Sequence, residues 1–208
     1  MDNRRRSLYL LKQANWGEDA TWIEGLKQWV YYPVVVEAME GLKVEALYKS
    51  AVHGSGHINR TLLMAAIIAW QEALTESLLR QYLMAVSYHD VGRYFDGLDL
   101  EHGSRSALKL EELTGYVGEP LREIQAAVAA HSQPDHLMEE MIQGYAPKDL
   151  DRATYLACLL KDADNLDRVR LGDLNPSYLR SQSAKRLATF SQRLFCLDQE
   201  LKKQMKAI

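Results

Sequence analysis

The feature that most constrains this chain is a helical repeat of apolar residues, which glycine and proline interrupt only between segments. In the stretch 58–74, Leu62, Ala66 and Ala69 recur at i, i+4 and i+7, the spacing of one helix face. Only 12 glycines and 5 prolines occur in 208 residues, and they fall near the ends of such stretches. The pattern predicts an all-α protein.

The same reasoning predicts the other helices and leaves two points open. Further helices are expected at about 75–90, 104–113, 120–131, 134–144, 149–166 and 183–206. The β-branched run 34–36 has no partner strand in view, so we interpret it as helix or loop. The amphipathic stretch 183–206 can pack within the chain or form the seam of a homodimer, and its periodicity does not decide between the two.

Charge and composition exclude several classes of protein. Lys and Arg number 25 against 28 Asp and Glu, a net charge of −3, which argues against a binder of nucleic-acid polymers. We interpret the run Arg4–Arg6 as a solvated N-terminus. No run approaches the ~20 apolar residues of a membrane span, and no secretion signal is recognisable. With two cysteines, Cys158 and Cys196, expected as buried free thiols, the chain is predicted to be cytoplasmic.

Histidines and aspartates stand at the ends of the predicted helices. His89 and Asp90 end one apolar helix, and His57 opens the helix before it. Asp164 lies one turn after Leu160, on the apolar face of a later helix. A carboxylate on a buried face requires a cation or a hydrogen-bonded partner, because burying it alone costs several kcal/mol. These residues are therefore candidate metal ligands.

Two more histidines extend the pattern. His131 continues the apolar stripe of Ile124 and Val128 and should point inward, whereas His102 precedes another helix. Imidazole and carboxylate groups are common ligands of transition metals. Six possible ligands thus stand at core-facing or capping positions of four or five helices.

The order His57, His89-Asp90, Asp164 resembles the HD superfamily of metal-dependent phosphohydrolases, over about residues 52–170. The resemblance implies a helical bundle with one or two divalent metals in its centre. We expect one domain, 1–208, with the terminal helices packed on that core. It further implies that His57, His89, Asp90 and Asp164 bind one metal, and that Asp90 bridges to a second metal held by His102 and His131. The mixed ligand set suits Fe, Mn, Co, Ni or Zn.

Other residues near these ligands are assigned provisional roles. His53, four residues before His57, is either a catalytic group that faces the site from the first turn or the preceding loop, or a simple helix-entry residue. The cations Lys161, Arg60 and Arg93 are predicted to bind a substrate phosphate, the alternative being surface charges. Asp162 and Asp167 are expected to be solvent-facing or salt-bridged.

The resemblance implies hydrolysis of a phosphate ester or anhydride by a metal-activated water that Asp90 orients. A nucleotide or another small organic phosphate is the expected substrate, because the charge balance does not favour a polymer. The run Val91–Tyr94 lacks the acidic pair of ppGpp hydrolases, and 144–146 departs from the motif of cyclic-di-GMP hydrolases. The alternative is a non-catalytic metal-binding module that senses a nucleotide or a protein partner.

Overall fold

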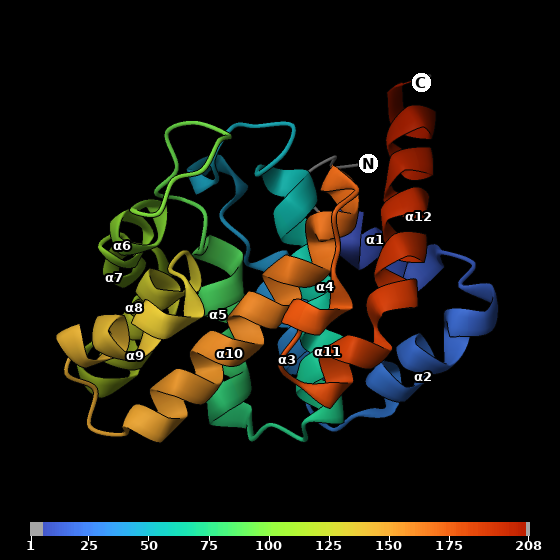
Figure 1. Ribbon diagram of the computed structural model, residues 1–208. Helices are drawn as coiled ribbons and strands as arrows, with labels where there is room; N and C mark the ends of the chain where they lie inside the picture. Colours follow the sequence, from blue (N-terminus) through green and yellow to red (C-terminus); the bar gives the residue numbers. More distant parts are fainter. Residues whose placement is uncertain (1–5, 207–208) are drawn as a thin grey trace.

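The computed structural model describes residues 6–206 and is built of helices, with no strand in that range (Figure 1). The α-helices are α1 (Arg6–Gln13), α2 (Ala20–Gln28), α3 (Tyr32–Glu40), α4 (Ser55–Gln71), α5 (Glu76–Tyr88), α6 (His102–Ala107), α7 (Leu110–Thr114), α8 (Gly118–His131), α9 (Asp135–Gly144), α10 (Leu150–Leu166), α11 (Gln182–Arg186) and α12 (Ala188–Lys206). Short 3-10 helices lie at Gly17–Asp19, Val44–Ala46, Asp167–Leu171 and Pro176–Tyr178. The prediction of an all-α fold is confirmed.

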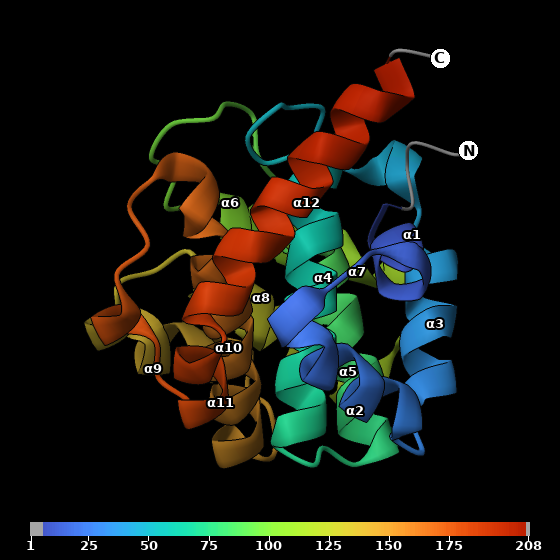
Figure 2. The ribbon, with the colours of Figure 1, turned by 90° about the vertical axis from the view of Figure 1, so that its right-hand side faces the viewer.

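Helix α4 is the central helix of the bundle. Every residue from His57 to Ala69 is buried, because α1, α2, α5, α10 and α12 all pack around it. A helix that is apolar on all sides is expected in such a central position. The rotated view shows α12 running across α4, with α1 and α3 to one side (Figure 2). A continuous apolar core extends from Leu10 in α1 to Leu201 in α12.

The helix boundaries follow from capping groups in the sequence. The Thr75 hydroxyl accepts a hydrogen bond from the Leu78 amide at the start of α5, and the Asp149 carboxylate accepts one from Arg152 at the start of α10. Gly115 ends α7 with a left-handed φ of 72°. The run 34–36 lies in α3 and is helical. The stretches 104–113 and 183–206 each form two helices instead of one.

Close contact between α6 and α8 depends on glycine. A Cβ atom at Gly103 would lie 2.6 Å from the Val128 carbonyl oxygen and 2.8 Å from that of Ala129, both in α8. Only a residue without a side chain fits there. The close approach brings the first residue of α6, His102, next to the last residue of α8, His131.

Two predictions about the periphery were wrong. Cys158 is only half-buried and Cys196 is exposed, since the polar face of α12 carries Cys196 to the surface. Arg6 is not solvated: its guanidinium is buried between the terminal helices and pairs with Asp198, with Nε 2.5 Å from Oδ1. Arg4 and Arg5 lie outside the described residues. No helix in the described part of the chain is long and apolar enough to cross a membrane.

Candidate metal centre

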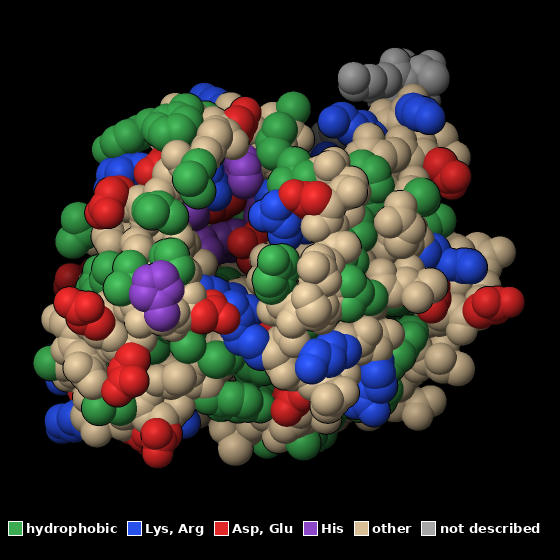
Figure 3. All heavy atoms as spheres, in the orientation of Figure 1, with side chains coloured by type: hydrophobic (Ala, Val, Ile, Leu, Met, Phe, Trp, Pro, Cys, Tyr) green, Lys and Arg blue, Asp and Glu red, His purple; other side chains and the backbone are tan. Residues whose placement is uncertain are grey.

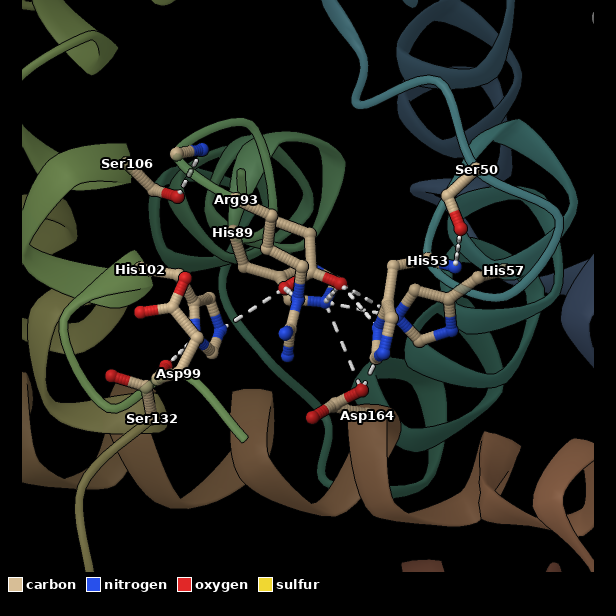
Figure 4. Close-up of polar contacts among 12 residues, drawn as sticks. Ser50, His53, His57, His89, Arg93, Asp99, His102, Ser106, Ser132 and Asp164 are labelled. Atoms are coloured by element: carbon tan, nitrogen blue, oxygen red, sulfur yellow. Dashed lines mark hydrogen bonds and ion pairs between the residues drawn. The ribbon is translucent and has the colours of Figure 1, made fainter. Parts of the chain in front are cut away.

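Seven side chains from separate parts of the chain converge in the centre of the bundle. His53 comes from the loop before α4 and His57 from its first turn, while His89 and Asp90 directly follow α5. His102 begins α6, His131 ends α8 and Asp164 lies near the end of α10. Figure 4 shows His53 and His57 on one side of the group, His102 on the other, and His89 and Asp164 between them. Figure 3 shows histidines at the bottom of an opening on this face.

One half of the group surrounds the Nε2 atom of His57. This atom lies 3.1 Å from Nε2 of His89, 3.2 Å from Oδ1 of Asp164 and 3.6 Å from Oδ2 of Asp90. His57 and His89 are buried, whereas the Asp164 side chain is 30% exposed. Two imidazole and two carboxylate groups thus face one point that solvent can reach.

The other half surrounds the second oxygen of Asp90. Oδ1 of Asp90 lies 3.1 Å from Nε2 of His102 and 3.9 Å from Nε2 of His131. The two imidazole nitrogens are 2.9 Å apart. Asp90 therefore directs one oxygen to each half, which is the arrangement that a bridging carboxylate requires.

The hydrogen bonds made by the Nδ1 atoms, which point away from the centre, show which tautomer each histidine adopts. Nδ1 of His89 donates to the Val86 carbonyl at 2.8 Å, and Nδ1 of His131 donates to the Val128 carbonyl at 2.5 Å. The Nδ1 atom of His102 likewise donates to the Asp99 carbonyl. A carbonyl only accepts, so Nδ1 carries the proton and Nε2 presents a lone pair to the centre.

Lone pairs on neighbouring Nε2 atoms repel each other unless a cation lies between them. The pairs His57–His89 and His102–His131 both show this arrangement. In the metal-free chain, a proton can fill this role, and the adjacent carboxylates raise the pKa of His89 although burial opposes the change. A divalent transition metal fits both positions, because imidazole nitrogen and carboxylate oxygen are its usual ligands.

The surroundings of the candidate ligands shift their pKa values toward the protonation states that bind metal. Burial opposes ionisation of Asp90, yet His89, His102 and His131 hold its pKa well below the ordinary value. His57 and His89 do the same for the pKa of Asp164. Burial lowers the pKa of His131 to about 4, so this ring is neutral at physiological pH. Ionised carboxylates and a neutral imidazole are the forms that bind metal.

A buried aspartate behind His57 was not singled out from the sequence as part of the site. Asp167, at the end of α10, accepts a hydrogen bond from Nδ1 of His57 at 2.8 Å. The expectation of a solvent-facing or salt-bridged residue holds only in its second half, since Asp167 is fully buried and paired with Arg60. Asp162 is likewise buried and paired, with Arg180. The sequence signal that could have indicated its role is its position one helical turn after the candidate ligand Asp164.

The remaining sequence candidates fall into different surroundings. Nδ1 of His53 lies 3.1 Å from Oδ2 of Asp90, so His53 belongs to the group. Nε of Arg93 lies 2.8 Å from the other Asp90 oxygen. Lys161 stands in the pocket beside the centre, with Nζ 2.8 Å from Asp135. The guanidinium of Arg60, in contrast, lies behind His57 and binds Asp167 and Asp198.

Comparison with known proteins agrees with this geometry. The family model of the HD domain matches residues 54–169, more than half of the chain. The chain therefore belongs to the HD-domain family, whose members are in general metal-dependent hydrolases of phosphate compounds. A search of the curated proteins and one of the solved structures gave no significant match.

Metal binding should stabilise the fold, and more so at higher pH. A metal at about 100 times its Kd adds ~2.7 kcal/mol, which raises the Tm by roughly 5–10 °C in a chain of this size. Acid should weaken the effect, because the proton favoured by the raised pKa of His89 must leave when a metal binds. Calorimetric melts with Mn²⁺ or with EDTA, at pH 6 and pH 8, measure this. Equal Tm values with and without metal at both pH values would contradict the proposed centre.

Proposed function

We propose that this protein is a metal-dependent phosphohydrolase that acts on a nucleotide or another small organic phosphate. The observation that carries the proposal is the position of Asp90, whose two carboxylate oxygens face two separate pairs of histidines. Bound divalent metals would lower the pKa of a coordinated water toward neutrality and withdraw charge from the phosphate oxygens. The ligands that we assign to them are His57, His89, Asp90, Asp164, His102 and His131.

The chain's own groups would orient the reactants and move protons. Asp90 is held between the two halves, and Nε of Arg93 restrains its Oδ1 atom at 2.8 Å. Nδ1 of His53 lies 3.1 Å from the other oxygen, and burial lowers the pKa of His53, which favours the neutral ring, with one nitrogen able to accept a proton. We assign His53 the role of accepting a proton beside Asp90.

The substrate would enter a pocket of about 650 Å³ that opens onto the centre. His131 and Asp164 form its inner end, and Lys161, Arg168 and Arg180 stand along its walls with Tyr178. Three carboxylates, Asp135, Asp164 and Asp173, balance the three cations. A pocket without net charge attracts a phosphate poorly, so the metals are the element that would select it. We assign Lys161 a phosphate contact, whereas Arg60 does not line this pocket.

The second candidate is a metal-binding module that senses a nucleotide or a protein partner without turnover. A single experiment tests both the enzymatic function and the sensor function. Metal-free protein reconstituted with Mn²⁺ or Ni²⁺ is assayed against phosphomonoesters, phosphodiesters and nucleotides, with an EDTA-treated sample as the control. We expect product release that depends on metal, at a rate at least ~100-fold above the EDTA control.

The outcomes of this screen separate the two functions. Metal-dependent product from a small phosphate supports the enzyme. Tight binding of a nucleotide to the metal-loaded protein, with no product, would reject it in favour of the sensor. Neither metal uptake nor product would reject both.

A further inference from the structure

A second cavity lies on the opposite side of His57 from the pocket of the metal centre. It has a volume of about 460 Å³, is partly open to solvent and lies between the N-terminal turn of α4, the loop before it, residues 170–171 and α12. Figure 2 shows α12 crossing α4 in this region. None of the seven side chains of the metal centre lines this cavity. It therefore cannot be the entrance of the site described above.

The walls of this cavity carry a surplus of positive charge. Arg6, Arg60, Arg170 and Lys202 line it, and Asp198 is the one carboxylate among its described lining residues. The pocket of the metal centre, in contrast, has three cations and three carboxylates. Arg6 forms an ion pair with Asp198. The other three cations, Arg60, Arg170 and Lys202, are then balanced by one further carboxylate, that of Asp167, which contacts Arg60 and Arg170 from outside the cavity.

The surplus charge is buried. The side chains of Arg60 and Arg170 are 5% and 6% exposed. Nε of Arg170 donates to the Val52 carbonyl and Nη1 to the Asp167 carbonyl, while Nη2 lies 3.2 Å from Nδ1 of His53. Its contact with a carboxylate is a long one, 3.5 Å from Nη1 to Asp167. Lys202 is half-buried and forms no ion pair with a described side chain. A buried cation without a full counter-charge is costly, and an anion in the cavity would offset that cost.

The backbone of α4 adds donors to the same space. Ser55 and Gly56, in the first turn of this 17-residue helix, line the cavity, and Gly54 at the cap offers no side chain to satisfy their amides. The amides and the positive end of the helix dipole favour an anion, as the guanidinium groups do. Phe195 and Leu171 supply an apolar wall, so there is room for more than the anionic group itself.

From these features we propose that the cavity between α4 and α12 binds the phosphate group of a small molecule, at a site separate from the metal centre. Planar guanidinium groups and a lysine ammonium are the side chains that bind phosphate best. The proposal does not depend on catalysis at the metal centre.

Arg60 connects the cavity to the metal centre through a chain of hydrogen bonds. Arg60 donates to Asp198 on the cavity side at 2.5 Å and to Asp167 at 2.6 Å, and Asp167 accepts from Nδ1 of His57. An anion that draws on Arg60 leaves Asp167 a stronger acceptor for the His57 proton, which makes Nε2 of His57 a better metal ligand. Occupancy of the cavity should therefore raise metal affinity, and metal should raise anion affinity by the same factor.

The test uses a matched pair of charge reversals on α12. Lys202 lines the cavity, whereas its neighbour Lys203 is exposed and does not. Titration calorimetry of the full-length, metal-free protein with inorganic phosphate, at constant ionic strength, should give saturable binding. We expect Lys202→Glu to weaken it about tenfold or more and Lys203→Glu to leave it nearly unchanged. Circular dichroism and the Tm of both variants verify that they fold.

Three results would overturn the proposed site. These are the absence of saturable phosphate binding to the wild type, equal weakening in the two variants, and equal binding in all three proteins. For the link to the centre, Co²⁺ affinity is measured spectroscopically with and without sulfate. Sulfate should tighten Co²⁺ binding severalfold in Lys203→Glu and not in Lys202→Glu. An equal effect in the two variants would show that sulfate acts elsewhere and would refute the link.

Discussion

Asp90→Asn should lose the metal centre while keeping the fold. The substitution removes the charge and one oxygen of the carboxylate that directs an oxygen to each half of the site, at 3.1 Å from His102 and 3.6 Å from His57. Loss of an outer-shell partner weakens metal binding by about 10–100-fold, so loss of a bridging ligand should cost at least ~100-fold. Metal analysis by mass spectrometry and the phosphohydrolase assay should both fall to background, with unchanged helical circular dichroism.

The control for this variant is Asp96→Asn. Asp96 lies six residues further along, is exposed and pairs with the Ser50 hydroxyl at 2.5 Å. The same change of chemistry there should leave metal content and turnover within about twofold of the wild type. Full metal content or full turnover in Asp90→Asn would reject the assignment of Asp90 as the bridging ligand.

Asp198→Ala should be among the most destabilising single substitutions in this chain. Asp198 is fully buried and binds two arginines, Arg6 and Arg60, whose side chains are 8% and 5% exposed. Removal of one partner leaves buried guanidinium charge uncompensated, which costs ~3–5 kcal/mol. The Tm should fall by roughly 6–20 °C, and urea unfolding should show the same loss in the free energy of unfolding.

An exposed ion pair provides the comparison. Glu24 lies 3.0 Å from Lys27 and its side chain is 60% exposed, so Glu24→Ala should cost no more than ~1 kcal/mol. A Tm for Asp198→Ala as high as that of Glu24→Ala would mean that the ion pairs of Asp198 with Arg6 and Arg60, which connect α12 to α1 and α4, contribute little to the stability of the fold. The second variant Asp198→Asn keeps the shape and should fall between the two.

Local signals in the chain were enough to predict most of the helices and to select the candidate metal ligands. Apolar spacing marked α4, α5, α8 and α10, because a buried helix face repeats every three to four residues whatever it packs against. The same spacing put His131 and Asp164 on inward faces, where an imidazole or a carboxylate needs a partner. The glycine-bounded ends of these helices then located His57 and His89.

Contacts between distant parts of the chain could not be predicted in this way. Arg60, expected to bind a substrate phosphate at the metal centre, does not line the pocket of that centre and pairs with Asp167 and Asp198, which follow it by 107 and 138 residues. Periodicity states which face a residue occupies and does not state which of several buried charges it will meet. For the same reason Cys196 was expected to be buried, although α12 turns this position outward.

By itself, the sequence determined that the chain is helical and that six candidate metal-ligand side chains lie on inward or capping positions, because both properties depend on local spacing. The family resemblance implied that Asp90 lies between two groups of ligands, and the structure shows its two oxygens facing different pairs of histidines. The tertiary structure alone decided that Asp167 accepts a hydrogen bond from Nδ1 of His57. It also decided that a second, cationic cavity lies between α4 and α12. These features depend on how helices far apart in the chain approach one another, and that geometry is set by the packing of the whole core.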